Sequence, residues 1–324
     1  MWVERALAAY EQCLEPTMIE VHQLTKRYGD VLAVDRLTFS VPAGQVTGFL
    51  GPNGAGKSTT MRAILGLDAV SSGTATVDGR RYVDLPTPLR AVGALLDAGG
   101  VLPGRTAFHH LLALAAGNGL SRTRVEEVLV EVGLAPVGRR RAGTFSLGMR
   151  QRLGIAAALL GDPPVLIFDE PLNGLDPEGI VWIRSLMRRM AAEGRTVLMS
   201  SHLMSEMELT ADHLIVIGRG RLIADTSMAS FIAMHSERQV VVRSPQIELL
   251  RSVLSGRGGL RGDDDADGLV VTGLEAAEIG TLAAAADVTL HELTTRRPSL
   301  EQAYLDLTRD ALEFGTSEEA NRWS

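Results

Sequence analysis

The chain has 324 residues, of which 45% are hydrophobic and 22% charged, so it falls in the range of ordinary globular proteins and not of disordered ones. Its formal net charge of −7 gives no overall attraction to a nucleic-acid backbone, and an aromatic content of 4% argues against broad base-stacking surfaces. A single cysteine, Cys13, excludes an internal disulfide and favours the cytosol as the compartment.

No stretch of the sequence has the pattern of a membrane span. The longest stretch without a charge, residues 37–56, contains Pro42, Pro52 and five glycines, so it does not suit a lipid-facing helix. Residues 1–17 contain three glutamates and lack a long apolar core, which argues against a signal peptide. If this chain works at a membrane, we expect a partner to supply the membrane part.

Apolar runs predict the secondary structure along the first two thirds of the chain. Strands are expected over residues 19–24, 36–41 and 45–50, followed by a Gly-rich turn, a helix from 57 to about 67, and a strand over 74–77. Residues 88–160 are predicted to be mostly helical, and a strand at 165–168, a helix at 177–192 and a strand at 196–200 follow. Strands that alternate with helices predict a mainly parallel sheet, here with a helical insertion.

A smaller unit is predicted from about residue 235 onward. We expect a strand at 239–243, a helix at 246–254, a short strand, a strand at 268–272, a helix at 276–285 and a strand at 288–293. This order is close to the βαββαβ pattern of a ferredoxin-like unit. The loop in the middle contains Asp263, Asp264, Asp265 and Asp267, but their spacing is not that of a calcium loop, so a solvated turn is the favoured interpretation.

A glycine-rich loop after the third predicted strand carries the first chemistry. It reads Gly51-Pro52-Asn53-Gly54-Ala55-Gly56-Lys57-Ser58 and fits G-x-x-x-x-G-K-[ST] between a strand and a helix. Its backbone N–H groups and the helix N-terminus suit phosphate oxygens. Lys57 is placed for the β- and γ-phosphates and the Ser58 hydroxyl for Mg²⁺. An ordinary glycine turn is the alternative.

Two carboxylates follow the apolar strand 165–168. Asp169 suits a magnesium ion held through water, and Glu170 suits the general base that activates the attacking water. Alone, such a pair is equally typical of helix capping. Together with the phosphate loop, it predicts a nucleotide hydrolase.

A further motif narrows the choice among families of nucleotide hydrolases. It reads Phe145-Ser146-Leu147-Gly148-Met149-Arg150-Gln151-Arg152. It resembles the L-S-G-G-Q signature of the ATP-binding cassette (ABC) family, with Leu147 in place of Gly and Met149 in place of Gln. Ser146 and the amide of Gly148 form a second anion-binding element at a helix start; a plain capped helix is the alternative. In the family, two cassettes sandwich two ATP molecules head to tail, so the resemblance implies that this element serves the nucleotide of another copy.

Further positions resemble the family pattern in the same order along the chain. Tyr28 resembles the aromatic residue that stacks on adenine, Leu175-Asp176 the loop that crosses the dimer interface, and His202 the histidine that reaches the γ-phosphate; a structural tyrosine or histidine is the alternative. Asp97 stands where the family has a glutamine. A carboxylate lacks the N–H donors of an amide, so the coupling role and a possible metal role of this position are open.

The resemblance implies an α/β fold of the P-loop NTPase type, with a mainly parallel sheet, a helical insertion at about 88–160, an antiparallel N-terminal β part, and a small α+β C-terminal unit. We therefore expect an N-terminal extension at 1–17, an ABC ATPase domain at 18–234, and an accessory domain with a C-terminal helix and tail at 235–324. Met18 is placed to start translation, so residues 1–17 are expected to be dispensable.

The expected site follows from the same resemblance. ATP is expected to bind Tyr28, Gly51, Pro52, Asn53, Gly54, Ala55, Gly56, Lys57, Ser58 and Thr59, and Ser146 and Gly148 of a second cassette. Lys57, Glu170 and His202 are expected to be catalytic. Ser58 and Asp169 are expected to hold Mg²⁺, partly through water, and whether Asp97 also contributes to the metal is open.

Details such as the signature residues and Asp97 resemble bacterial drug- or antibiotic-exporter ATPases. The implied partners are an integral-membrane permease and a second copy of this chain or a related cassette, at the cytoplasmic face of the membrane. The run Arg139-Arg140-Arg141 is more often a solvated surface than a site; the alternative is a contact with the membrane partner or with anionic lipid. The alternatives are an ABC ATPase that acts on nucleic acid or the ribosome, a catalytically inactive cassette, and an importer.

Overall fold

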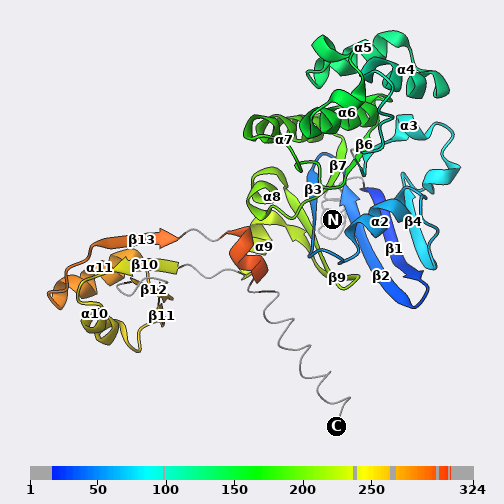
Figure 1. Cartoon of the computed structure of the whole chain (residues 1–324). Helices are drawn as coiled ribbons and strands as arrows, with labels where there is room; N and C mark the ends of the chain where they lie inside the picture. The colour runs from blue at the N-terminus through cyan, green and yellow to red at the C-terminus, as the bar shows by residue number, and fades with distance from the viewer. Residues whose placement is uncertain are drawn as a thin grey trace, which may run out of the picture. The chain divides into compact units, whose positions relative to one another are not determined.

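The computed structural model describes residues 17–97, 99–235, 239–262, 268–296, 299–305 and 307. It divides into two compact units, Met1–Ser227 and Met228–Ser324 (Figure 1). The predicted N-terminal extension falls almost entirely outside the described residues, as does the aspartate-rich loop at 263–267. The domain limits expected from the sequence, 18–234 and 235–324, remain a prediction.

The first unit begins with an antiparallel sheet in the order β2-β1-β4. Its strands are β1 (Thr17–Tyr28), β2 (Val31–Pro42) and β4 (Ser72–Val77). Thr17 pairs with Pro42, so β1 begins one residue before the predicted domain start at Met18. These strands are longer than predicted because register shifts along β1 and β2 interrupt the apolar alternation that sequence patterns detect.

A second sheet has six strands in the order β5-β6-β7-β3-β8-β9. They are β3 (Val46–Leu50), β5 (Val92–Leu95), β6 (Val165–Phe168), β7 (Thr196–Ser200), β8 (His213–Gly218) and β9 (Arg221–Ser227). All pairs are parallel except β8–β9, which is a hairpin. Every residue of β3, β6 and β7 is buried, as expected for central strands that are covered on both faces. The predicted mainly parallel α/β fold is thus confirmed.

Strand β5 is an exception within residues 88–160, which are otherwise mostly helical as predicted. Val92 pairs with Val165 and Leu95 with Phe168, so β5 is an edge strand of the main sheet. A four-residue apolar run cannot be distinguished from a piece of helix by its periodicity, and here the neighbouring strand decides. The remaining insertion is helical: α3 (Pro88–Ala91), α4 (Ala107–Gly117), α5 (Arg122–Glu131) and the start of α6 (Leu147–Leu159), with short 3-10 turns at Ala135–Val137 and Ala142–Thr144.

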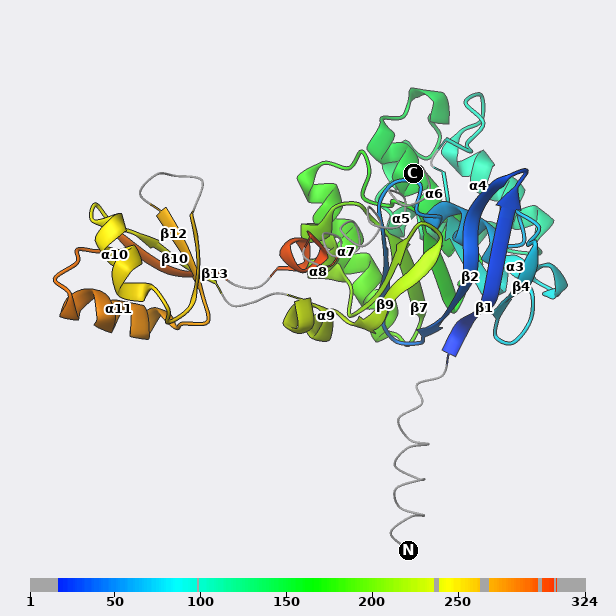
Figure 2. The same cartoon turned by 90° about the horizontal axis from the view of Figure 1, so that it is seen from below.

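Helix α2 (Lys57–Ile64) packs between the two sheets, where one core joins Met61 and Ile64 to Ile19 of β1 and Leu198 of β7. Helix α2 ends at Ile64, before the end predicted at about Leu67. Figure 2 shows α7 (Pro177–Ala192) and α8 (Met204–Thr210) on the other side of the parallel strands. Asp176 caps α7 by accepting the N–H of Gly179, and Pro177 occupies its first turn. No helix among the described residues is long and apolar enough to cross a membrane.

The second unit confirms the predicted ferredoxin-like order. It contains α9 (Met228–His235), β10 (Gln239–Arg243), α10 (Ile247–Leu254), β11 (Gly259–Gly262), β12 (Gly268–Thr272), α11 (Ala276–Ala285) and β13 (Glu292–Arg296). The antiparallel sheet has the order β11-β12-β10-β13, and its core joins β10 and β12 to α10 and α11. The last strand lies later than the predicted 288–293, because Val288 packs into the core after α11 before the chain pairs with β10.

Candidate functional site

The phosphate loop connects the end of β3 to the first turn of α2. Gly54 and Gly56 have φ angles of +81° and +102°, which side chains rarely adopt. A Cβ atom at Gly56 would lie 2.7 Å from the carbonyl oxygen of Ala33. Gly56 is also the N-cap of α2 and carries no side-chain cap, so the first N–H groups of the helix remain available to an anion.

A cleft of about 240 Å³ opens over this loop. It is lined by Ala33, Asn53, Gly54, Gly56, Lys57, Ser58, Thr59, Asp169 and Glu170. The fold therefore brings the glycine-rich loop and the acidic pair into one cavity, although more than a hundred positions of the chain separate them. Gly51, Pro52 and Ala55 belong to the same loop but do not line the cleft.

Lys57 is buried in this site, with 7% of its surface exposed. Its Nζ donates to the carbonyl oxygens of Gly51 at 2.6 Å and of Pro52 at 3.2 Å. Burial lowers the pKa of Lys57, and the nearby charges of Glu170 and Asp169 oppose this shift. An ammonium group and two carboxyl groups thus share one cleft, which is the charge arrangement needed to hold a phosphate together with a cation.

The acidic pair is oriented by Ser200, the buried last residue of β7. The Ser200 hydroxyl donates to Asp169 Oδ1 at 2.5 Å and accepts the backbone N–H of Glu170 at 2.8 Å. No sequence motif indicates a role for Ser200. The sequence does show a polar residue at the end of the strand that comes after the one followed by Asp169 and Glu170. Only the strand order of the folded sheet, however, shows that these two strands are neighbours.

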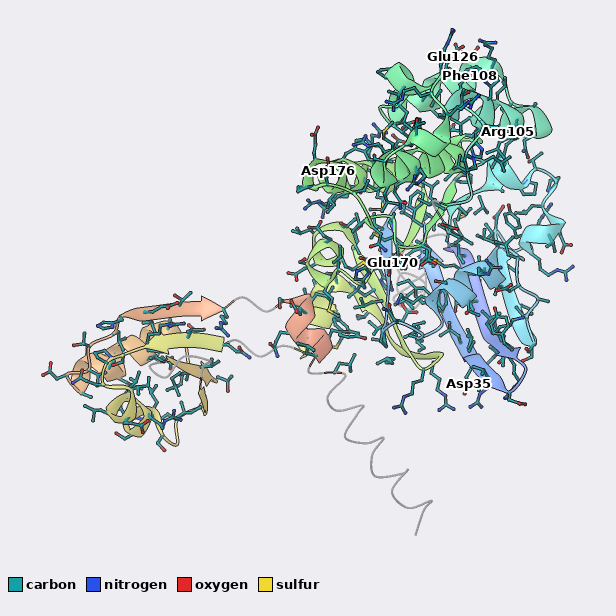
Figure 3. The ribbon with its side chains drawn as sticks, viewed as in Figure 1. Asp35, Arg105, Phe108, Glu126, Glu170 and Asp176 are labelled. Atoms are coloured by element: carbon teal, nitrogen blue, oxygen red, sulfur yellow. The ribbon has the colours of Figure 1, made fainter. Side chains whose placement is uncertain are left out.

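Glu170 has a φ angle of +50°, which is uncommon for a residue other than glycine. Its Oε2 atom lies 2.8 Å from Nδ1 of His202 and accepts the backbone N–H of His202 at 3.3 Å. The buried Gln151 of α6 donates to the carbonyl oxygens of Glu170 at 3.4 Å and of Pro171 at 2.9 Å. Figure 3 labels Glu170 near the middle of the first unit. Gln151 is a second residue whose contribution the sequence motif did not reveal.

Tyr28 and Asp97 lie outside the residues that line the cleft. Tyr28, at the end of β1, is 45% exposed, and its hydroxyl donates to Asp68 Oδ2 at 2.6 Å. Asp97 is exposed just beyond the end of β5, and its Oδ1 accepts the backbone N–H of Gly99 at 2.6 Å. This bond makes Asp97 part of a local turn, and its coupling and metal roles stay predictions.

The signature residues form the start of α6. Ser146 is the N-cap, and its Oγ accepts the N–H of Met149 at 3.2 Å. Leu147 and Gly148 contact the loop before α7: a Cβ atom at Gly174 would meet Leu147 Cδ2, and one at Gly148 would lie 3.4 Å from the carbonyl oxygen of Gly174. None of these signature residues lines the cleft over Lys57.

The comparisons with known proteins agree with this geometry. The family model described as ABC transporter matches residues 34–173, and a domain of unknown function, DUF8746, matches residues 238–301. The bacitracin transport ATP-binding protein BcrA of Enterococcus faecalis is 40% identical over 215 residues, which are 65% of this chain and 70% of that protein. The lantibiotic transport ATP-binding protein SrtF of Streptococcus pyogenes is 36% identical over 208 residues, 64% of this chain and 90% of the relative.

A longer match extends through the second unit. The uncharacterized ABC transporter ATP-binding protein YdbJ of Bacillus subtilis (strain 168) is 31% identical over 301 residues, 92% of this chain and 97% of the relative. Among solved structures, an ATP-binding subunit of an ABC transporter is 31% identical, has a TM-score of 0.62, and aligns with 67% of this chain and 93% of its own. The dimeric bacterial ABC transporter cassette MJ0796 is 25% identical with a TM-score of 0.60, over 65% of this chain and 99% of its own. This chain therefore belongs to the ABC transporter family, as one of its ATP-binding and ATP-hydrolysing subunits.

Proposed function

We propose that this chain powers the export of antibiotic-like compounds, as a cassette that works in pairs on a separate integral-membrane permease at the cytoplasmic face of the membrane. The observation that carries the proposal is the cleft that joins Lys57, Ser58, Asp169 and Glu170. The relatives BcrA and SrtF are named for bacitracin and lantibiotic transport, which supports export of compounds of this kind.

Each side chain of the expected site has a chemical role, both among the residues that line the cleft and among those outside it. Lys57 neutralises the β- and γ-phosphates while the loop N–H groups bind their oxygens. Glu170 accepts a proton from the attacking water, and the contact with His202 orients its carboxylate. Tyr28 stacks on the adenine ring. Ser146 and Gly148 bind the γ-phosphate of the nucleotide on the second copy.

The donor set also fits Mg²⁺, which prefers hard oxygen ligands. Ser58 and Asp169 line the same cleft. The Ser200 hydroxyl donates to Asp169 Oδ1, so Oδ2 is the oxygen that we assign to a cation or its waters. When bound, the ion would neutralise part of the phosphate charge. Asp97 lies outside this set, so we assign it to coupling with the permease.

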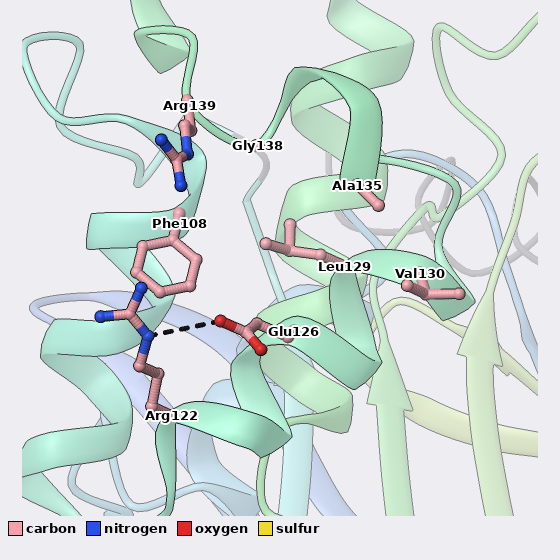
Figure 4. A pocket seen from close by; sticks show the side chains of 8 residues that line it. All are labelled: Phe108, Arg122, Glu126, Leu129, Val130, Ala135, Gly138 and Arg139. Atoms are coloured by element: carbon pink, nitrogen blue, oxygen red, sulfur yellow. Dashed lines mark hydrogen bonds and ion pairs between the residues drawn. The ribbon is translucent and has the colours of Figure 1, made fainter.

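A groove of about 210 Å³ in the helical insertion supports a contact with the permease. Figure 4 shows Phe108 between the guanidinium groups of Arg122 and Arg139, with Arg122 paired to Glu126 at 3.3 Å. Apolar side chains of Leu129, Val130 and Ala135 complete the lining. An apolar floor beside arginines suits a permease segment with an apolar anchor and an acidic residue.

Exchanging Arg139 for glutamate should lower transport without changing the ATPase rate of the isolated chain. Unchanged transport would exclude this groove as the contact with the permease.

The test of export compares the native protein with Lys57→Ala and Glu170→Gln in the native host. Both variants should increase sensitivity to a peptide antibiotic in a panel that contains bacitracin and a lantibiotic. Unchanged sensitivity across the panel, with ATP hydrolysis abolished, would exclude export of these compounds.

Co-purification tests the alternative of an ABC ATPase that acts on nucleic acid or the ribosome. Recovery of ribosomes instead of a permease with the purified protein would favour this alternative, which the net charge of −7 disfavours.

A further inference from the structure

Tyr28 belongs to a cluster of four side chains with Asp68, Arg62 and Lys26. Its hydroxyl donates to Asp68 Oδ2 at 2.6 Å, and the guanidinium group of Arg62 binds the same carboxylate, through Nε to Oδ2 at 2.9 Å and Nη2 to Oδ1 at 3.3 Å. The Asp68 side chain is 15% exposed. Hydrogen bonds to an ionised acceptor are shorter and stronger than neutral ones, so this carboxylate holds the phenol in a defined place.

Lys26 covers the tyrosine ring. Its Nζ lies 4.5 Å from the ring centroid and donates to the carbonyl oxygen of Ala69 at 2.7 Å. The ammonium group is thus fixed over one face of the ring by a cation–π contact and a hydrogen bond. A planar ligand can stack on the ring only from the opposite face.

The ionisation states favour this arrangement at neutral pH. The hydrogen bond to Asp68 is the largest cause that raises the pKa of Tyr28, so the phenol keeps its proton. The hydrogen bond from Arg62 is the largest cause that lowers the pKa of Asp68, so the carboxylate stays ionised. Donor and acceptor therefore keep their roles across the physiological range.

The cluster also connects the ring to the phosphate-binding helix. Arg62 lies in the last turn of α2, the helix that starts with Lys57 and Ser58. The backbone N–H of Leu67 returns to the carbonyl oxygen of Arg62 at 2.9 Å, which places Asp68 next to the same helix. The position of the ring is thereby set relative to the phosphate loop.

We infer that Asp68 is a positioning residue for base recognition: together with Arg62 and Lys26 it holds Tyr28 so that one ring face alone receives the purine. This inference rests on the proposed role of Tyr28 in stacking on adenine. The inference assigns the two ends of the nucleotide to different residues. The phosphates bind to the loop, whereas the base binds more tightly because the Tyr28 ring is already oriented.

The experiment measures KM and kcat for ATP, together with binding of inorganic tripolyphosphate, which has no base. Asp68→Ala and Tyr28→Phe should each raise KM for ATP about fivefold to tenfold, the size expected for the loss of one typical hydrogen bond. The value of kcat and the affinity for tripolyphosphate should change less than about twofold. Asp68→Asn, which retains an acceptor oxygen, should recover part of the loss, and Asp68→Ala should have no further effect in the Tyr28→Phe background.

The matched control is Asp84→Ala. It removes a similar pair, Arg81 Nε to Asp84 Oδ2 at 2.7 Å, that has no tyrosine attached, so it should leave both measurements unchanged.

Tyr28→Ala tests the proposed stacking itself: an unchanged KM in that variant would refute the role of Tyr28. If Tyr28→Ala raises KM but Tyr28→Phe and Asp68→Ala do not, the positioning inference alone is wrong. Equal losses for ATP and tripolyphosphate would also overturn it, and Tyr28→Phe decides the matter if Asp68→Ala fails to fold.

Discussion

The helices α2 and α6 both begin at loops that suit an anion, yet their surroundings differ. Neither helix has an acidic residue in its first turn. At α2, the N-cap is Gly56 without a side-chain cap, and Lys57, Asp169 and Glu170 share the cleft. At α6, the Ser146 hydroxyl already accepts the N–H of Met149, and the next residue is the half-exposed Leu147.

This difference separates a complete site from a partial one. The start of α2 has its counter-charge and its carboxylates in place, so it can bind and hydrolyse a nucleotide. The start of α6 offers the partial positive charge of a helix N-terminus and a few N–H groups, which bind an anion weakly unless a second surface closes over it. The comparison therefore supports our proposal that α6 serves the nucleotide on another copy.

The largest expected effect comes from removing the charge of the complete site. Lys57→Ala should lower kcat/KM for ATP at least about hundredfold, because the phosphates lose their buried counter-charge. Glu170→Gln should also stop turnover but leave ATP binding intact, since it removes only the group that we propose as proton acceptor. Equilibrium binding of a fluorescent ATP analogue and a phosphate-release assay separate the two. Native turnover by Glu170→Gln would show that another group is the base.

A second experiment tests the partial site. In the Glu170→Gln variant, ATP should cause self-association and ADP should not, because in our proposal the γ-phosphate is what the start of α6 binds. A difference of about 3 kcal/mol would shift the dimer constant more than hundredfold. Sedimentation velocity with ATP, with ADP and without nucleotide measures this. Adding Ser146→Arg, which blocks the start of α6, should abolish the dimer; monomers in every condition would leave the permease as the means of pairing.

A smaller effect is expected from Ser200, which orients the carboxylates of the complete site. Ser200→Ala removes its hydrogen bonds to Asp169 Oδ1 and to the N–H of Glu170. We expect kcat to fall about tenfold with little change in ATP affinity. Ser201→Ala is the matched control, since its hydroxyl is also buried but accepts the backbone N–H of Leu203. Equal losses in the two variants would indicate a general packing defect instead.

The smallest effect on hydrolysis is expected from Asp97, which contributes to neither helix start. Its carboxylate caps a turn by accepting the N–H of Gly99. Asp97→Ala should lower transport in membranes with the permease, while the ATPase rate of the isolated chain stays within a few-fold. A complete loss of basal hydrolysis would place Asp97 near the metal and would contradict the assignment to coupling.

The sequence by itself determined the local features. The phosphate loop is readable because glycines with positive φ and a following helix are properties of adjacent residues. The caps at Ser146 and Asp176 are equally local. The alternation of apolar strands with helices was enough to predict the parallel sheet and the ferredoxin-like order of the second unit, because the apolar pattern reflects which faces are buried.

Tertiary structure decided what depends on strand order and on side chains distant in sequence. Strand β5 exists because β6 offers it a parallel partner, and Ser200 meets Asp169 because β7 lies beside β6. The contact of Tyr28 with Asp68 brings together the end of β1 and the turn that follows α2. Such pairings have no signature in a single sequence, because each partner alone is an ordinary polar or apolar residue, and the long-range packing that joins them forms only in the folded chain.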